Sequence, residues 1–282
     1  MVSAVSGGDA SLTPSSLRTA LAGTRFADVR WVAETGSTNA DLAALAADGA
    51  PEGVVLVADH QIAGRGRLGR TWTAPAGSSL LLSVLFRPAL PVGHAHALTT
   101  AVALAAREAC TEVAGITPGL KWPNDLVVAV PGADGAERKL AGVLAESSLA
   151  GAHLDAVVVG IGLNVNWPRA LPVEIADLAT SLNHLAGDAV DRAGLLASLL
   201  VGLDRRYTAL LGPGGRAALR DEEHAASATL GRRVRVLRAH DEVEGTAVGF
   251  TDEGALRLEV DTDVLVVPVG DVVHLRPGAS SV

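Results

Sequence analysis

The chain of 282 residues predicts a mixed α+β fold, in which helices cover one face of a β-sheet and a small β-barrel follows. Two observations support this prediction. Strands and helices do not alternate strictly before residue 228, which argues against a doubly wound parallel sheet. Beyond that point the pattern changes to short strands with tight turns, which is typical of a small barrel. We therefore expect a larger domain over residues 15–227 and a barrel domain over residues 228–282.

Hydrophobic periodicity predicts the elements of the larger domain. Helices are expected over residues 17–29, 95–113, 191–211 and 216–226, with another beginning near Thr38. Buried strands are expected over residues 54–58, 80–86, 139–147 and 157–165. Residues 120–130 form either a strand pair or one strand broken by Pro123, and a Pro/Gly-rich hairpin tip follows. The barrel strands are expected over residues 232–237, 243–250, 256–260, 264–267 and 272–275.

Composition limits the kinds of partner that the chain can bind. Hydrophobic residues make up 49% of the sequence and charged residues 19%, which is typical of a soluble enzyme-sized protein. The formal net charge of −8 argues against nucleic acid as the main partner, because phosphate binding needs a basic surface. No apolar stretch approaches the length of a membrane span. Residues 1–14 lack the basic start and apolar core of a signal peptide, so we expect a disordered leader in a cytoplasmic protein.

The most informative stretch is Gly64-Arg65-Gly66-Arg67-Leu68-Gly69-Arg70, which Thr71 and Trp72 follow. Glycine lets a backbone approach a ligand closely, and guanidinium groups bind carboxylates and phosphates through two hydrogen bonds. We therefore expect a loop that closes over an anionic small molecule. A flexible solvated loop and an Arg/Gly segment that coats RNA are the alternatives. Such segments usually recur in basic chains, whereas this one occurs once in an acidic chain.

Two lysines and one helix start are further candidates. Only two of the 23 basic residues are lysines, Lys121 and Lys139, and lysine supplies a compact point charge where a planar guanidinium would not fit. Thr38 with Asp41 matches a capping box. This motif is either a plain helix cap or a helix N-terminus that binds a polar ligand. Cys110 lies in a predicted helix, and we expect it to pack in the core.

Glycines also interrupt the strand predicted over residues 157–165. Gly160 and Gly162 resemble half of a nucleotide-binding fingerprint, but the third glycine and the following helix are missing. Glycine inside a strand indicates close approach by a ligand or by another backbone. Asn164 and Asn166 follow and are expected to point to the same side of the strand. His60 is expected to be a strand-end residue without a catalytic role.

Taken in order, these segments resemble the motifs of the biotin protein ligases. The segments that carry the resemblance span most of residues 34–166, and they are Ser37-Thr38-Asn39, Gln61, the stretch Gly64 to Arg70, Lys121-Trp122-Pro123-Asn124-Asp125, Lys139-Leu140-Ala141-Gly142 and Gly162-Leu163-Asn164-Val165-Asn166. The resemblance implies a catalytic domain of the class II synthetase-like, biotin/lipoyl ligase fold and an SH3-like C-terminal barrel.

The resemblance also implies a two-step reaction that uses ATP and biotin. The biotin carboxylate attacks the α-phosphate of ATP, which gives biotinyl-5′-AMP and pyrophosphate, with Mg²⁺ on the phosphates. A lysine of the biotin carboxyl carrier domain of an acyl-CoA carboxylase then accepts the biotinyl group. Members that also repress transcription carry an N-terminal helix-turn-helix domain. Only about thirty residues precede Glu34, so the resemblance predicts a ligase that does not bind DNA.

Site residues follow from the resemblance by position. It assigns to biotin the residues Ser37, Thr38, Asn39, Gln61, Arg65, Gly66, Arg67, Lys139 and Gly142. It assigns to ATP the residues Arg65, Arg67, Arg70, Trp72, Lys139, Asn164 and Arg276. A solvated tail arginine is the alternative for Arg276. Lys139 and Arg67 are the implied catalytic residues. Asp125 is implied to bind the metal or to orient a neighbouring basic group, with a plain turn residue as the alternative, and Lys121 is either functional or a structural ion-pair partner.

The chain departs from the family pattern at two places, and two other functions are alternatives. The chain carries a Pro/Gly-rich extension at residues 129–138, and Leu68 stands where family members often have a basic residue. A lipoate or octanoate ligase would share the catalytic fold, but those families lack the Arg/Gly loop. A ligand-binding or RNA-associated protein without chemistry is the third interpretation.

Overall fold

The computed structural model describes residues 14–275 except 131–135, 151–152 and 239. Its main sheet, called the central sheet below, has seven strands in the order β1-β2-β3-β7-β6-β5-β4. β1 and β2 are parallel, and all other neighbours in the sheet are antiparallel. The predicted mixed sheet is therefore confirmed. The strands are β1 (Val29–Thr35), β2 (Val55–Gln61), β3 (Ser79–Phe86), β4 (Gly119–Lys121), β5 (Asp125–Ala129), β6 (Glu137–Ala150) and β7 (His153–Asn164).

The edge strand β1 was not predicted. The helix expected over residues 17–29 is wrong from residue 21 onward, because α1 spans only Pro14–Ala20 and Gly23 takes a left-handed backbone conformation with φ of 85°. β1 pairs with β2 alone, and most of its residues are partly or fully exposed. An edge strand with so little burial lacks the apolar pattern that a sequence search detects.

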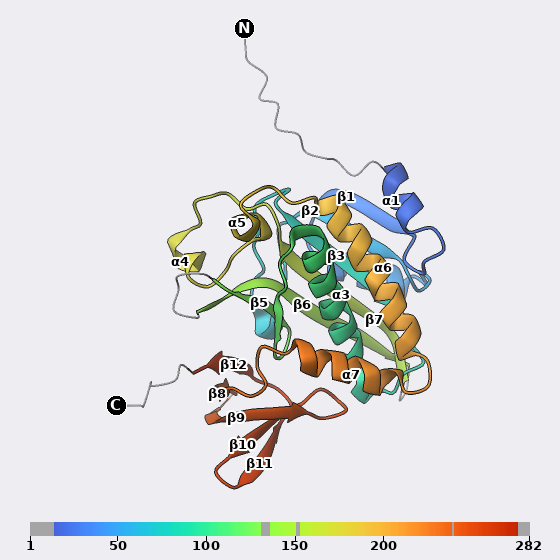
Figure 1. Ribbon diagram of the computed structural model, residues 1–282. Coiled ribbons are helices and arrows are strands. Elements are labelled where there is room, and N and C mark those ends of the chain that lie inside the picture. The colour runs from blue at the N-terminus through green and yellow to red at the C-terminus, as the bar shows by residue number, and fades with distance from the viewer. Residues whose placement is uncertain (1–13, 131–135, 151–152, 239, 276–282) are drawn as a thin grey trace.

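Long helices cover one face of the central sheet. α3 (His96–Ala114) and α6 (Arg192–Leu210) pack against each other in front of the strands in Figure 1, and α7 (Gly215–Ala226) crosses their lower ends. The core between these helices and the sheet consists mainly of leucine, valine and alanine. Cys110 belongs to this core, where burial raises the pKa of its thiol to about 12. The prediction that it packs in the core is confirmed.

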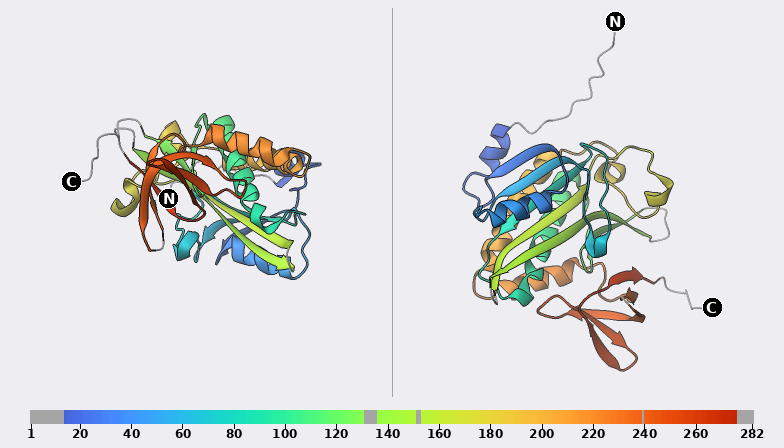
Figure 2. Two further views of the ribbon diagram at one scale, coloured as in Figure 1. Left: turned by 90° about the horizontal axis from the view of Figure 1, so that it is seen from below. Right: turned by 180° about the vertical axis from the view of Figure 1, so that it is seen from behind.

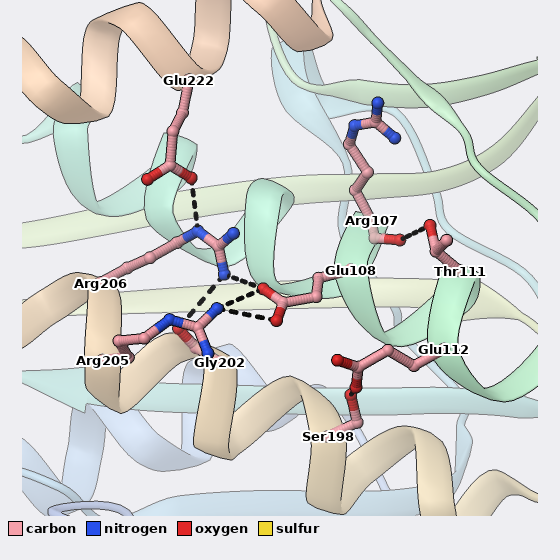
Figure 3. A network of polar contacts seen from close by, with 9 residues as sticks. All are labelled: Arg107, Glu108, Thr111, Glu112, Ser198, Gly202, Arg205, Arg206 and Glu222. Carbon is pink, nitrogen blue, oxygen red and sulfur yellow. Dashed lines mark hydrogen bonds and ion pairs between the residues drawn. The ribbon is translucent and has the colours of Figure 1, made fainter.

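Glu108 connects the three helices of this layer, as Figure 3 shows. Its carboxylate on α3 accepts hydrogen bonds from Arg205 and Arg206 on α6, and Arg206 donates a further bond of 2.9 Å to Glu222 on α7. Although burial acts to raise the pKa of Glu108, these hydrogen bonds and charges hold it below its usual range. The network therefore fixes the helix layer at the end near α7.

One helix lies on the other face of the sheet. α2 (Thr38–Ala47) packs Leu42 and Ala46 against Leu85 of β3 and Val158 of β7. Neighbouring residues on each strand bury their side chains in the layer of long helices. Two short helices, α4 (Val173–Ala176) and α5 (Leu182–Ala186), follow β7. The second face of the sheet is thus only partly covered by helix, which leaves room for a site.

The turn between β4 and β5 resolves the alternative around Pro123. The two strands pair as an antiparallel hairpin, so the interpretation as a strand pair is right. The Trp122–Pro123 peptide bond is cis. Trp122 is 5% exposed and belongs to the hydrophobic core of the C-terminal strands, where its Nε1 donates a 2.9 Å hydrogen bond to the carbonyl of Gly254.

The C-terminal strands form a five-stranded antiparallel sheet in the order β11-β10-β9-β8-β12, called the C-terminal sheet below. It lies beneath the central sheet in Figure 1, and β11 and β12 are its edge strands. The five predicted strands are confirmed. They form a sheet with two edge strands and not a closed barrel. They are β8 (Arg233–Leu237), β9 (Glu242–Phe250), β10 (Leu256–Val260), β11 (Asp263–Val267) and β12 (Asp271–His274).

Some predictions concern residues that the structure does not describe. These are the leader over residues 1–14, apart from Pro14, most of the tip of the extension at 129–138, and Arg276. Where the structure describes the chain, no helix combines the length and apolar character that crossing a membrane requires. The right view in Figure 2 again shows the C-terminal sheet below the central sheet, and in the left view, seen from below, it lies in front of the central sheet.

Candidate functional site

A cavity of about 260 Å³ opens on the face of the central sheet that carries α2. The Arg/Gly loop, the start of α2, β6, β7, the β4–β5 turn and β12 surround it. The structure brings together every residue predicted for biotin, since the lining includes Ser37, Thr38, Asn39, Gln61, Arg65, Gly66, Arg67, Lys139 and Gly142. Arg70, Trp72, Lys121 and Asp125 line the same cavity.

The start of α2 is fixed by Gln61 of the neighbouring strand β2. Its Oε1 accepts hydrogen bonds from the Thr38 backbone N–H at 2.8 Å and from Thr38 Oγ1 at 3.0 Å. The predicted capping box is wrong, because Ser37 is the N-cap and makes no side-chain cap bond in the structure as described. Asp41 instead accepts a hydrogen bond from Thr35 Oγ1. The cap comes from a residue distant in sequence, which a local motif cannot reveal.

Ser83 is a site-supporting residue that the sequence prediction missed. It is fully buried on β3, and its Oγ lies 2.7 Å from Thr38 Oγ1 and 2.6 Å from Asn39 Oδ1. The signal available in the sequence is a lone serine within the otherwise apolar run of β3 after Ser79. A hydroxyl in such a run needs a hydrogen-bond partner, which here lies at the start of α2.

The Arg/Gly loop is a tight hairpin. The Gly66 N–H donates to the Arg70 carbonyl at 2.7 Å, and the Trp72 N–H donates to the Gly64 carbonyl at 2.9 Å. Leu68 and Gly69 both have positive φ, of 56° and 74°. The left-handed conformation is easy for glycine and costly for leucine. Leu68 is also 67% exposed, so an apolar side chain lies at the tip of the loop.

The three loop arginines have different partners. Arg65 Nη2 lies 3.0 Å from Glu146 Oε2 on β6, and Arg70 forms an ion pair with Asp271 on β12. Arg67 Nη1 lies 3.7 Å from Asp271 Oδ1 and also contacts Asn124. Burial lowers the pKa of the Arg67 guanidinium, while neighbouring carboxylates oppose this effect. The partly buried Arg67 thus presents a fixed positive charge to the cavity.

Glycines form the floor of the cavity and receive the indole of Trp72. A Cβ atom at Gly162 would lie 2.4 Å from the Trp72 ring, and one at Gly142 would lie 3.1 Å from it. These glycines are opposite each other on β7 and β6. The close approach expected at the glycine strand is thus made by a side chain, the Trp72 indole, and not by another backbone. Approach by a ligand stays a prediction. Its Nε1 is buried and has no hydrogen-bond partner among the described residues.

Lys139 lies between this indole and a carboxylate. Its Nζ is 2.7 Å from Asp125 Oδ1 and 5.3 Å from the centroid of the Trp72 ring. The backbone of Lys139 is held on both sides, by hydrogen bonds to Leu178 and Thr180. Asp125 therefore pairs with a basic group, and the roles predicted for it stay predictions.

The side chains around Asp125 could hold a metal ion only together with other ligands, such as substrate phosphates. In the part of the chain that the structure describes, no group of three or more histidine, cysteine, aspartate or glutamate side chains could hold a metal ion. Mg²⁺ is commonly bound by one or two carboxylates together with substrate phosphates. Asp125 could serve in that way only in exchange for part of its contact with Lys139.

Two predicted ATP residues are not placed at the cavity. Asn164 is 1% exposed, donates a 2.9 Å hydrogen bond to the Thr180 carbonyl and lies outside the lining. Arg276 is outside the described residues. Lys121 faces the cavity, and its charge contributes to lowering the pKa of Glu137. His60 pairs with Glu34 at 3.0 Å, away from the cavity lining.

Comparisons with known proteins agree with this fold and site. The model of the biotin/lipoate A/B protein ligase family matches residues 33–164, and that of the biotin protein ligase C-terminal domain matches residues 229–275. A biotin–[acetyl-CoA-carboxylase] ligase of Mycobacterium tuberculosis is 42% identical over 261 residues, which is 90% of this chain and 92% of the relative. The bifunctional ligase/repressor BirA of Bacillus subtilis is 35% identical over 230 residues, with 81% and 68% covered.

A solved structure shows the same similarity. The biotin protein ligase from Aquifex aeolicus in complex with biotin and ATP has a TM-score of 0.74 and 29% identity, and the match covers 89% of this chain and all of that one. Fold, cavity and relatives together define a ligase enzyme. The chain belongs to the biotin protein ligase family.

Proposed function

We propose that this enzyme activates biotin with ATP as biotinyl-5′-AMP and then transfers biotin to a lysine of the biotin carboxyl carrier domain of an acyl-CoA carboxylase. The observation that carries the proposal is the position of Lys139. Its ammonium group lies over the glycine floor, beside the Trp72 indole and within the same cavity as Arg67. The names of the relatives, biotin–[acetyl-CoA-carboxylase] ligases, support the choice of acid and acceptor.

The first step needs two anions to be held together. The biotin carboxylate and the ATP phosphates repel each other, and negative charge develops at the α-phosphate as the carboxylate attacks. Arg65, Arg67 and Lys139 supply positive charge around one cavity. Lys139 is the group best placed for the reacting centre, because Asp125 fixes its direction and its backbone is hydrogen-bonded on both sides.

The remaining cavity residues would divide between the two substrates. The Gln61 carbonyl oxygen is used by Thr38, so its amide N–H groups are the part that can bind the biotin head, together with the Ser37 hydroxyl. Arg70 and Trp72 would bind the nucleotide, and Asn164 and Arg276 remain proposed ATP residues. When bound to the phosphates, Mg²⁺ would supply further positive charge, with Asp125 as the residue that could hold it.

In the second step the acceptor lysine attacks the acyl carbon of the adenylate, and AMP leaves. No side chain of the enzyme needs to form a covalent bond in either step. We further propose that the enzyme acts without binding DNA, which the formal net charge of −8 supports, and that it works in the cytoplasm. The division into domains at residues 227 and 228 also stays a prediction.

The test is exchange of labelled pyrophosphate into ATP, with biotin, lipoate and octanoate run in parallel. We expect exchange with biotin only. Exchange with lipoate or octanoate alone would show that the acid is wrong, and folded protein with Mg²⁺ that exchanges with none of them would contradict adenylation. The acceptor is tested by the mass increase of a carrier domain, with a variant lacking its target lysine as the control.

A further inference from the structure

Glu146 connects two walls of the cavity without lining it. It lies on β6, two residues beyond Leu144, which does line the cavity. A single oxygen, Oε2, accepts hydrogen bonds from Asn39 Nδ2 at 2.8 Å and from Arg65 Nη2 at 3.0 Å. Asn39 belongs to the first turn of α2, and Arg65 belongs to the Arg/Gly loop. One carboxylate thus joins the helix to the loop.

The side chain of Asn39 is occupied by protein groups. Its Nδ2 donates to Glu146 and, at 3.2 Å, to the Leu144 carbonyl, which uses both N–H groups of the amide. Its Oδ1 accepts from Ser83. The residue is 4% exposed, and a Cβ atom at Gly160 would lie only 2.1 Å from Oδ1. Asn39 is therefore turned toward the protein, whereas the resemblance predicts that it binds biotin directly.

We propose that Glu146 is a positioning residue for biotin binding, and that Asn39 acts with it. Glu146 sets the place of Arg65 relative to the start of α2, so the two walls between which the biotin head would bind are held at a fixed separation. This inference rests on the proposed function. The Arg65 branch is open to solvent, since the two side chains are 44% and 36% exposed, whereas the Asn39 branch is buried.

The kinetic test compares the wild type with Glu146→Gln and Glu146→Ala. The alanine variant should raise the KM for biotin about fivefold and leave kcat within about twofold, as expected for a partly exposed ion pair and one hydrogen bond that act on binding alone. The glutamine variant should have a smaller effect, because its carbonyl oxygen can still accept from Asn39. Glu242→Gln is the matched control, since Glu242 also pairs with an arginine, 3.8 Å away on the C-terminal sheet.

Two outcomes of this comparison would overturn the inference. One is an unchanged KM for biotin in the alanine variant. The other is a loss of kcat without a change in KM, which would indicate a direct part in the chemistry. In the double variant Glu146→Ala/Arg65→Ala, the KM for biotin should rise by less than the product of the two single increases, because both changes remove the same contact. A simple product would show that the two residues act independently.

A second measurement does not depend on activity. Trypsin cleaves after arginine, so its rate of cleavage within the loop, followed by mass spectrometry, reports how firmly the loop is held. We expect Glu146→Gln to be cleaved about threefold faster than the wild type and Glu242→Gln, because the charge that holds Arg65 is lost. Equal rates would overturn the inference. A wild type that shows no exchange with biotin would refute the proposed function instead, and cleavage would still test the contact.

Discussion

The two faces of β7 differ in composition and in task. Val157, Val159 and Leu163 point into the core beneath α3 and α6 and are fully buried. Gly160 and Gly162 alternate with them and face the cavity. Side chains on one face fill the space against the helices, and the missing side chains on the other face leave space for Trp72 and for a ligand.

The difference shows how one strand separates stability from function. In a close-packed core, removing or adding volume costs stability. Above the glycines the neighbours are the Trp72 ring and polar side chains at the start of α2, which a new side chain would displace from the site. Substitutions on the two faces should therefore have different effects on stability and on activity.

Lys139→Ala should reduce biotin-dependent pyrophosphate exchange by about a thousandfold or more, because the charge nearest the reacting centre is lost. The fold should be kept, since Lys139 is partly exposed and its removal leaves no core cavity. Exchange kinetics with circular dichroism provide the measurement. Arg138→Ala, one residue earlier and paired with Asp177 at the surface, is the control and should retain exchange. Wild-type exchange by the lysine variant would remove Lys139 from the mechanism.

Gly162→Val and Leu163→Ala are neighbouring changes on opposite faces. The valine should lower exchange about a hundredfold, because it pushes Trp72 out of place and small misplacements in a site are costly. Its free energy of unfolding should change by less than about 1 kcal/mol, since the clash is with a loop side chain. The alanine should lose about 3 kcal/mol of stability and keep its specific activity. Denaturant unfolding and exchange assays on both proteins give the result, and a parallel loss of both properties would erase the distinction between the faces.

Arg67→Ala should make the adenylate escape about tenfold faster, which corresponds to about 1.4 kcal/mol of lost binding. The guanidinium links the loop to Asp271 and Asn124, and its loss should leave the loop open more often. Biotinylation of an unrelated bystander protein, measured by mass spectrometry, should rise accordingly. Arg238→Ala, in a surface pair with Asp241, serves as the comparison. If the bystander remains unmodified, Arg67 does not retain the adenylate.

Glu137→Gln should cost about 2 kcal/mol of stability at pH 7, because the partly buried Glu137 carboxylate lies 2.7 Å from His274 Nδ1 between the two sheets. Burial acts to raise the pKa of Glu137, but the His274 hydrogen bond and the nearby charges of Arg232 and Lys121 hold it below its usual range. A carboxyl group whose pKa is lower in the folded than in the unfolded protein stabilises the fold at pH values above its unfolded pKa, near 4.3. This stabilisation is lost as the pH falls through the pKa of the folded protein. The difference in the free energy of unfolding between wild type and variant, measured with urea, should therefore become smaller in acid. A gap that is constant from pH 7 to pH 3 would contradict this role.

Most elements and the membership of the site could be predicted from the sequence, because both depend on local patterns. The predicted strand over residues 256–260 agrees with β10 at both ends, and the α6 prediction began at its N-cap, Asp191. The Arg/Gly loop, Lys139 and the start of α2 meet at one cavity, as the motif order implied. These features are coded by turn residues, apolar periodicity and segment order, all of which a single chain displays.

The contacts between distant segments could not be predicted. Gln61 caps α2 from 23 residues away, and Ser83 and Glu146 support Asn39 across separations of 44 and 107 residues. None of these residues has a local neighbour that would reveal its partner. The motifs of Asn39 and Asn164 predict contacts with ligands. Both amide nitrogens donate to backbone carbonyls, while Asn164 Oδ1 is buried without a hydrogen-bond partner among the described residues. A motif thus identifies a region of the molecule, and the task of each side chain in it stays a prediction.

The most direct test of the central claim is a crystal structure of the chain with biotin and a non-hydrolysable ATP analogue. We expect biotin on the glycine face of β7, with its head near Ser37 and Gln61 and its carboxylate toward Lys139. Biotin bound elsewhere, for example in the second cavity between α3 and α7 that His96 and Glu223 line, would show that the biotin site is wrong.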